Sequence, residues 1–150
     1  MNRIIKLNSY RKNILLSGQS LFEVIVALAL VTLIITAVVT LATSSIRNAD
    51  FSRDNALATK YAQEAVEWMR QERDVSWSTF RTATLSKTQL GTLSWSAGTD
   101  VIPGTKFKRT MKFDHDGDDS VTADVIVKWE DGNGVHEVKS RTILTNWQEL

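Results

Sequence analysis

The pattern of this chain begins with a long apolar run that contains a single charged side chain. Residues 17–43, SGQSLFEVIVALALVTLIITAVVTLAT, include one carboxylate, Glu23. A stretch of about 20 apolar residues is long enough to cross a bilayer as a helix. A carboxylate inside such a stretch costs about 2 to 3 kcal/mol on insertion scales, so it is normally kept for a function. The pattern predicts a membrane-spanning helix with Glu23 as a candidate functional residue.

Beyond the apolar run, apolar positions recur at helical spacing. Residues 46–73 contain no glycine or proline, and their apolar side chains repeat every three or four positions. This stripe consists of Leu57, Ala58, Tyr61, Ala62, Ala65, Trp68 and Met69. We expect one helix from about residue 20 to 73, roughly 80 Å long, with an apolar first half and an amphipathic second half.

The next segment, residues 74–106, is rich in serine and threonine and lacks helical periodicity. It is interpreted as a connector, with short strands at TATL (82–85) and TLSWS (92–96). Its aromatic side chains Trp77, Phe80 and Trp95 either cover the apolar face of the helix or form an exposed contact patch. Both alternatives are open at this stage.

From residue 107 the apolar period changes to two. Phe107, Arg109, Met111 and Phe113 share one face of a first strand, and Val121 to Trp129 and His136 to Trp147 supply two more. The EDGNG segment (130–134) supplies a hairpin turn. Three strands joined by short loops predict an antiparallel meander with one face on the helix. The predicted fold class is therefore α+β, a long N-terminal helix packed on a small antiparallel sheet.

Charge is unevenly distributed along the chain. Residues 1–18 carry Arg3, Lys6, Arg11 and Lys12 and no acidic residue, whereas the whole chain has 18 basic and 17 acidic side chains. Positive charge before an apolar span keeps that end in the cytoplasm, so the C-terminal domain is expected outside the cytoplasmic membrane. The absence of cysteine excludes disulfides, a thiol nucleophile and a thiolate metal site.

Patterns for catalysis or metal binding are sparse. His115 and His136 lie near no plausible serine nucleophile and at no metal-ligand spacing. No glycine-rich phosphate loop follows a strand. We therefore expect no enzymatic activity and no cofactor. The acidic loop Asp114–Asp119 departs from an EF-hand in the place of its glycine, so a calcium site and a solvated hairpin loop are both open.

Three interpretations compete for the N-terminal 43 residues. A secretory signal has a shorter apolar region followed by a small-residue cleavage site. A plain membrane anchor fits the length but leaves Glu23 unexplained. In the third interpretation, GQSLFEVIVALAL (18–30) closely resembles the prepilin processing motif of type IV pilins and pseudopilins. Four features coincide: a basic leader, a glycine, a glutamate five residues later, and a long apolar run.

The resemblance implies specific processing and assembly roles. A prepilin peptidase would cut between Gly18 and Gln19, and the new amine of Gln19 would be methylated. Glu23 would then pair with the N-terminal amine of a neighbouring subunit during assembly. The sequence departs from the common pattern at Gln19, Ser20 and Phe22, where phenylalanine, threonine and isoleucine are usual, and Gln19 leaves methylation open.

The implied organisation divides the chain into five parts. These are a leader (1–18), a transmembrane and assembly half of the helix (19–45), an amphipathic half (46–73), the connector (74–106) and a sheet head (107–150). The implied partners are other pilin or pseudopilin subunits, prepilin peptidase, the inner-membrane assembly platform and membrane lipid. The implied location is the cytoplasmic membrane and then an extracytoplasmic filament.

The expected function is a structural subunit of a type IV pilus or pseudopilus. The apolar half of the helix contains no helix-breaking proline or glycine, which favours a minor or priming subunit. One alternative is a competence pseudopilin that contacts DNA through a basic stripe. That stripe would consist of Lys106, Lys108, Arg109 and Lys112. A second alternative is a single-span anchored domain that never assembles.

Overall fold

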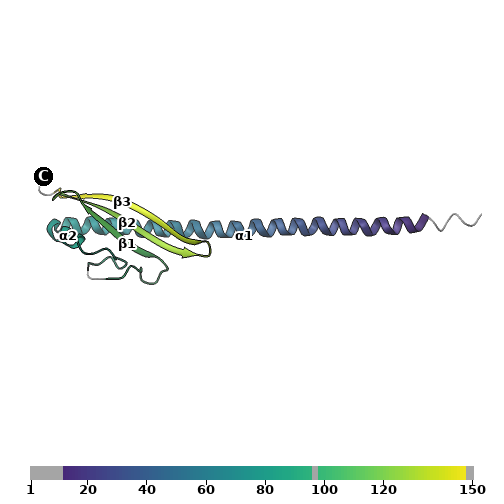
Figure 1. The fold of residues 1–150 in the computed structure, drawn as a ribbon, viewed down its shortest axis with the longest axis horizontal. Coiled ribbons are helices and arrows are strands. Elements are labelled where there is room, and N and C mark those ends of the chain that lie inside the picture. The colour runs from purple at the N-terminus through teal and green to yellow at the C-terminus, as the bar shows by residue number, and fades with distance from the viewer. Residues whose placement is uncertain (1–11, 96–97, 148–150) are drawn as a thin grey trace, which may run out of the picture. The chain divides into compact units, whose positions relative to one another are not determined.

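The computed structural model describes residues 12–95 and 98–147, with only the backbone described for residues 12–19. Its elements are α1 (Lys12–Val75), α2 (Trp77–Thr84), β1 (Lys108–His115), β2 (Ser120–Asp131) and β3 (Gly134–Thr145) (Figure 1). The long N-terminal helix and the three-stranded antiparallel sheet confirm the predicted α+β class. The chain divides into two compact units, residues 1–49 and 50–150, and α1 contributes to both.

In its described part, the first unit is the apolar half of α1. Every described side chain from Ser20 to Ala49 is exposed. Many of these residues are valine, isoleucine and threonine, whose branched side chains have modest helix propensity in water. In lipid, however, a helix satisfies all of its backbone groups internally, so the apolar environment itself favours helix over any open conformation.

The second unit contains the sheet, with the strand order β1-β2-β3. β1 pairs with β2 from Lys108 opposite Lys128 to His115 opposite Val121. β2 pairs with β3 over twelve positions without a bulge, from Ser120 opposite Thr145 to Asp131 opposite Gly134. Figure 1 shows the three strands beside the second half of α1. The meander predicted from the alternation of apolar residues is confirmed.

The core lies between the amphipathic part of α1 and one face of the sheet. Four residues of the predicted stripe are buried completely or nearly so: Ala58, Ala62, Ala65 and Met69. Three of these are alanines, and their small side chains let the helix backbone come close to the sheet. The sheet contributes buried residues that share one face of the strands: Met111, Val121, Ala123, Val125, Val127, Trp129 and Leu144. The predicted core faces of the helix and the strands are thus confirmed.

The expected strands in the connector are wrong. Residues 77–84 form helix α2, which includes most of TATL, and residues 92–95 of TLSWS form no strand. Ser76 has an extended backbone that ends α1, and its hydroxyl accepts a hydrogen bond from the Thr79 amide at 3.3 Å, which caps α2. Serine and threonine have low helix propensity, so α2 depends on the burial of Phe80 and Thr84.

The connector aromatics cover the helix, which confirms the first of the two alternatives for them. The Trp95 ring lies 4.7 Å from the Trp68 ring and 5.9 Å from the buried Phe80 ring. The Trp95 indole nitrogen also donates to Glu72 on α1 at 2.7 Å. Trp77 is half-buried, with its ring 5.9 Å from Phe80. This cluster extends the core past the edge of the sheet.

We predict that Met111→Ala lowers the free energy of unfolding by about 2 to 5 kcal/mol, because it leaves a cavity in a fully buried site. Val135→Ala is the matched control on an exposed strand position and should change it by less than about 0.5 kcal/mol. Urea unfolding followed by tryptophan fluorescence measures both. Equal losses in the two variants would contradict this placement of the core.

Candidate functional site

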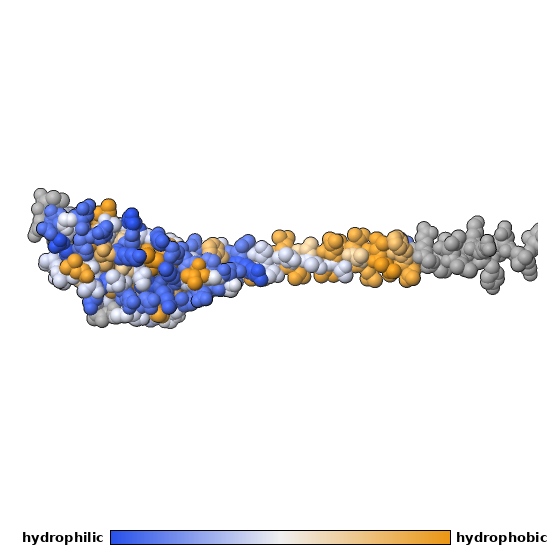
Figure 2. All heavy atoms as spheres, viewed as in Figure 1, coloured by the Kyte–Doolittle hydropathy of each residue, from blue (hydrophilic) through white to orange (hydrophobic). Residues whose placement is uncertain are grey.

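The described part of the first unit contains an apolar helical segment whose side chains are exposed in the part of the chain that the structure describes. We call residues 20–44 of α1 the stem. Its large apolar residues, among them Leu21, Phe22, Leu33 and Leu41, are exposed by between 40 and 72% around the whole circumference. Figure 2 shows the resulting apolar surface in orange. Among the described residues, this is the one helical region long and apolar enough to cross a membrane.

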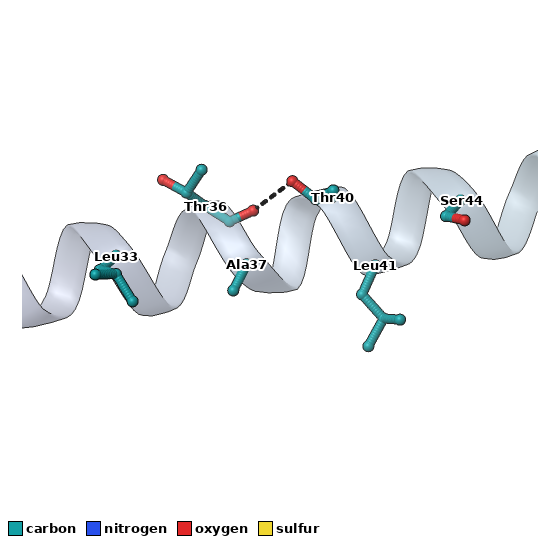
Figure 3. Close-up of a pocket in the computed structure, with 6 residues that line it drawn as sticks. All are labelled: Leu33, Thr36, Ala37, Thr40, Leu41 and Ser44. Atoms are coloured by element: carbon teal, nitrogen blue, oxygen red, sulfur yellow. Dashed lines mark hydrogen bonds between the residues drawn. The ribbon is translucent and has the colours of Figure 1, made fainter.

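The threonine hydroxyls of the stem donate hydrogen bonds to backbone carbonyls of the same helix. Thr36 donates to the carbonyl of Thr32 at 2.8 Å. Thr40 donates to the carbonyl of Thr36, also at 2.8 Å (Figure 3). Thr32 and Thr43 make the same kind of bond to the carbonyls of Ala29 and Val39. A hydroxyl without a hydrogen bond is costly in an apolar environment, and these bonds remove that cost. The stem therefore suits lipid despite its threonines.

One side of the stem is lined by small side chains. Thr32, Thr36, Thr40 and Ser44 follow one another at intervals of four residues and therefore lie on one face. Thr36, Ala37, Thr40 and Ser44 line a shallow open groove of about 670 Å³, with Leu33 and Leu41 beside them (Figure 3). Small residues at this spacing let helices in membranes approach each other closely. Such a face would allow a neighbouring helix to come close to the backbone of the stem.

Glu23 is the only charged side chain of the stem, and it is exposed. Among the described residues, no side chain forms an ion pair with its carboxylate. The backbone of α1 places Gln19 one helical turn before Glu23. Residues 1–11 of the expected leader lie outside the described residues, and only the backbone of Gly18 and Gln19 is described. Cleavage after Gly18 and methylation of Gln19 therefore stay predictions.

The basic stripe of the DNA-contacting alternative is interrupted at Arg109, which is only 2% exposed. Its guanidinium donates to the backbone carbonyls of Tyr61, Leu90 and Gly91 at 3.1, 3.0 and 2.6 Å. Burial lowers the pKa of Arg109 because it removes water from the charged group. Of the other members, Lys106 pairs with Asp54 at 2.6 Å. The four residues therefore do not form a continuous cationic surface.

Arg109 instead joins three parts of the second unit, since its three carbonyl partners belong to α1 and the connector. The connector passes so close that a side chain at Gly91 would collide with the backbone carbonyl of Val101, which explains the glycine there. The alternation of Phe107, Arg109 and Met111 was the signal that placed Arg109 on the core face. The sequence gave no sign of its carbonyl partners, because they lie 18 to 48 residues away.

The acidic loop is held against α2. Arg81 donates to the carboxylate of Asp118 at 2.6 Å and to the carbonyl of Gly117 at 3.1 Å. The Trp77 indole donates to the carbonyl of Asp118 at 3.2 Å. Within residues 12–95 and 98–147, no three histidine, aspartate or glutamate side chains are gathered as they would be around a metal ion. The geometry assigns this loop a packing role beside α2.

The two histidines each have one polar partner. The ring of His115 lies 2.9 Å from the Thr84 hydroxyl, and that of His136 lies 2.9 Å from the Asp131 carboxylate. Asp131 also accepts a hydrogen bond from the backbone of Asn133, and this bond and the His136 contact lower its pKa. These contacts fasten the ends of strands and turns to their surroundings.

The comparisons with known proteins add no relative. No protein-family model, curated protein or solved structure matches the chain. The interpretation of the stem therefore depends on its own residues: the apolar circumference, the small-residue face and Glu23.

We predict that Arg109→Met lowers the free energy of unfolding by about 2 to 4 kcal/mol. The substitution keeps most of the side-chain volume but leaves the carbonyl of Gly91 without its Arg109 donor and the carbonyl of Leu90 with only the Leu93 amide, at 3.3 Å. Lys112→Met, on the exposed side of the same strand, is the control and should change stability little. Chemical unfolding of the two variants in parallel tests this. Comparable stability of Arg109→Met and wild type would contradict the joining role.

The pair Asp124–Arg141 generates a pH prediction. Two hydrogen bonds from Arg141, at 2.6 and 2.7 Å, lower the pKa of Asp124 below its usual value of about 3.9. Because the folded pKa is the lower one, this pair stabilises the fold above about pH 4, and the contribution is lost as pH falls through the folded pKa. In thermal melts between about pH 5 and 2, Asp124→Asn should lose less of its Tm than wild type. An unchanged slope would contradict the prediction.

Proposed function

We propose that this chain is a structural subunit of a type IV pilus or pseudopilus that assembles through its N-terminal helix. The observation that carries the proposal is the stem: a fully exposed apolar circumference with Glu23 as its only charge, directly after Gly18 and Gln19. A plain anchor would need no carboxylate, and a soluble domain would cover its apolar helix. A helix that moves from lipid into a bundle of identical helices needs both features.

Glu23 would determine how neighbouring helices align in that bundle. An unpaired carboxylate in an apolar environment costs several kcal/mol, whereas a carboxylate paired with a cation costs much less. Cutting after Gly18 would create a cation, the amine of Gln19, one helical turn before Glu23. In a bundle, the amine of one subunit can meet the Glu23 of its neighbour only at one axial offset. The pair would then set the register between helices.

The small-residue face of the stem supports close packing in the same bundle. The hydroxyls of Thr36 and Thr40 are bonded to helix carbonyls, so a neighbouring helix could approach them without leaving these groups unpaired. Residues 50–150 form a separately packed unit. The role is structural and not catalytic, and the partners are other pilin subunits, prepilin peptidase, the assembly platform and lipid.

The unbroken helix favours a minor or priming subunit. Residues 19–75 contain no proline or glycine, so α1 has no obvious point of local melting during assembly. The pairing of Lys106 and the burial of Arg109 speak against the DNA-contacting alternative, because they remove two of its four cations.

The first test is the intact mass of the membrane-extracted protein, made together with a prepilin peptidase. We expect the loss of residues 1–18, with or without one added methyl group at Gln19. Gly18→Val should retain the leader, because in the family that this motif resembles the peptidase cuts after the glycine. A full-length mass of the wild-type chain under these conditions would overturn the processing step.

The second test is assembly of the Glu23→Ala variant. Without the carboxylate, register between helices is lost, so the yield of fibre or of cross-linked oligomers should fall at least about tenfold, the effect of about 1.4 kcal/mol per contact. Glu64→Ala, on the exposed side of the amphipathic half, is the matched control and should assemble normally. Correct processing but unchanged behaviour of Glu23→Ala would favour the anchored domain that never assembles.

A further inference from the structure

The turn between β2 and β3 carries the one asparagine of the chain that is followed by a glycine. β2 ends at Asp131 and β3 begins at Gly134, and these two residues pair with each other, so Gly132 and Asn133 form the tip of the turn. Asn133 is exposed. Gly134 has a φ of 125°, and a side chain there would find nothing within 4 Å. The Asn133–Gly134 pair is therefore accessible from solvent.

An asparagine can react with the backbone nitrogen of the residue that follows it. In this reaction the nitrogen of Gly134 attacks the side-chain carbonyl carbon of Asn133, the side-chain nitrogen leaves as ammonia, and a succinimide ring forms. Solvent water then opens the ring at either of its two carbonyls, which yields aspartate or isoaspartate. A side chain on the second residue hinders the attack. Glycine has none and allows the close approach that the ring requires.

The place of the pair at the end of the hairpin leaves it able to react within the folded chain. Gly134 pairs with Asp131 as the last pair of the β2–β3 ladder, so opening this single pair frees the Gly134 amide. Terminal pairs of this kind open at little cost in free energy. Formation of the succinimide therefore does not require the sheet to unfold.

The neighbouring Asp131–Gly132 pair has the same spacing but is protected from this reaction. The Asp131 carboxylate accepts a hydrogen bond from the backbone amide of Asn133 at 2.7 Å and lies 2.9 Å from the His136 ring. These contacts lower the pKa of Asp131, so its side chain stays ionised. A carboxylate is attacked by a nucleophile much less readily than a neutral amide. Asn133 is therefore the reactive residue of the turn.

We propose that Asn133 is a site of spontaneous deamidation, which converts the tip of the β2–β3 hairpin to aspartate or isoaspartate as the protein ages. Either product adds a negative charge beside Asp131. Isoaspartate also inserts an extra backbone atom, because the chain then runs through the side-chain methylene carbon. A turn that connects directly paired strand ends has little room for this atom. The modification does not depend on assembly into a pilus.

The effect of the modification extends to α1 through His136. The His136 ring lies 5.2 Å from the Phe51 ring of α1 and 5.3 Å from the Trp129 ring of β2. The same Asp131 oxygen faces His136 and accepts the bond from the Asn133 backbone, so a distorted turn disturbs both contacts. We expect the end of the hairpin to pack less firmly on α1 after conversion, with faster amide exchange at His136.

The test is peptide mapping of the full chain in detergent micelles after incubation in neutral buffer for days. Trypsin releases residues 129–139, in which Asn133 is the only side-chain amide. We expect this peptide to gain the mass difference between an amide and an acid and to separate into an aspartate and an isoaspartate form. Asn48 and Asn55 are internal controls, because each is exposed but is followed by alanine. Their peptides should convert at least about tenfold more slowly, which corresponds to a barrier higher by about 1.4 kcal/mol.

Two variants separate the reaction from its effect on the hairpin. Asn133→Gln keeps a side-chain amide but would have to form a larger ring, so residues 129–139 of this variant should keep their mass. Asn133→Asp adds the charge without the extra backbone atom, and its exchange rate at His136 should lie between those of fresh and fully converted wild type. NMR-detected amide exchange measures this rate.

Three results would overturn the proposal. No conversion of Asn133, or conversion no faster than at Asn48 and Asn55, would contradict the assignment of the site. Equal conversion of Asn133→Gln would show that the mass change arises elsewhere. Unchanged exchange at His136 in converted protein would contradict the effect on the contact with α1.

Discussion

The contact between the alanine-lined stripe of α1 and one face of the sheet holds the second unit together. Ala58, Ala62 and Ala65 bring the helix backbone close to the strands, and Met69 fills the space beyond them. The small sheet has only three strands and no disulfide, so it could not bury enough apolar surface without this helix. Everything else in the unit, from the connector to α2, is arranged around this contact.

The placement of polar groups follows from the same contact. Arg109 lies on the core face of β1, where its charge would be costly without partners, and the carbonyls of Tyr61, Leu90 and Gly91 supply them. In return, the guanidinium fixes the connector along the edge of β1. Arg109, whose charge suggests a place on the surface, thus organises the interior. It also helps the connector to cover the outer edge of β1, so among the described residues the outer edge of β3 is the open edge of the sheet.

The stem has the opposite character from the amphipathic half, although both belong to α1. From residue 50 onward the helix buries one stripe within its own chain, whereas the stem buries nothing. Its threonines bond to their own backbone, and its one charged side chain, Glu23, has no ion-pair partner among the described residues. Such a segment is incomplete as a single chain, and this is the physical basis for proposing assembly.

Local patterns were sufficient for the helix, the strands and the core faces. The apolar run, the stripe from Leu57 to Met69 and the alternation from Phe107 onward are periodicities that reflect burial directly, so the sequence by itself determined the α+β class, the stem and Glu23. Helix α2 was not predicted, because serine and threonine give only a weak local signal for a helix. Its stability comes from the burial of Phe80 and Thr84 and from the contacts with Asp118. The carbonyl partners of Arg109 and the openness of β3 were decided only by the tertiary structure. Both depend on where the connector passes, which is set by contacts between residues far apart in the chain.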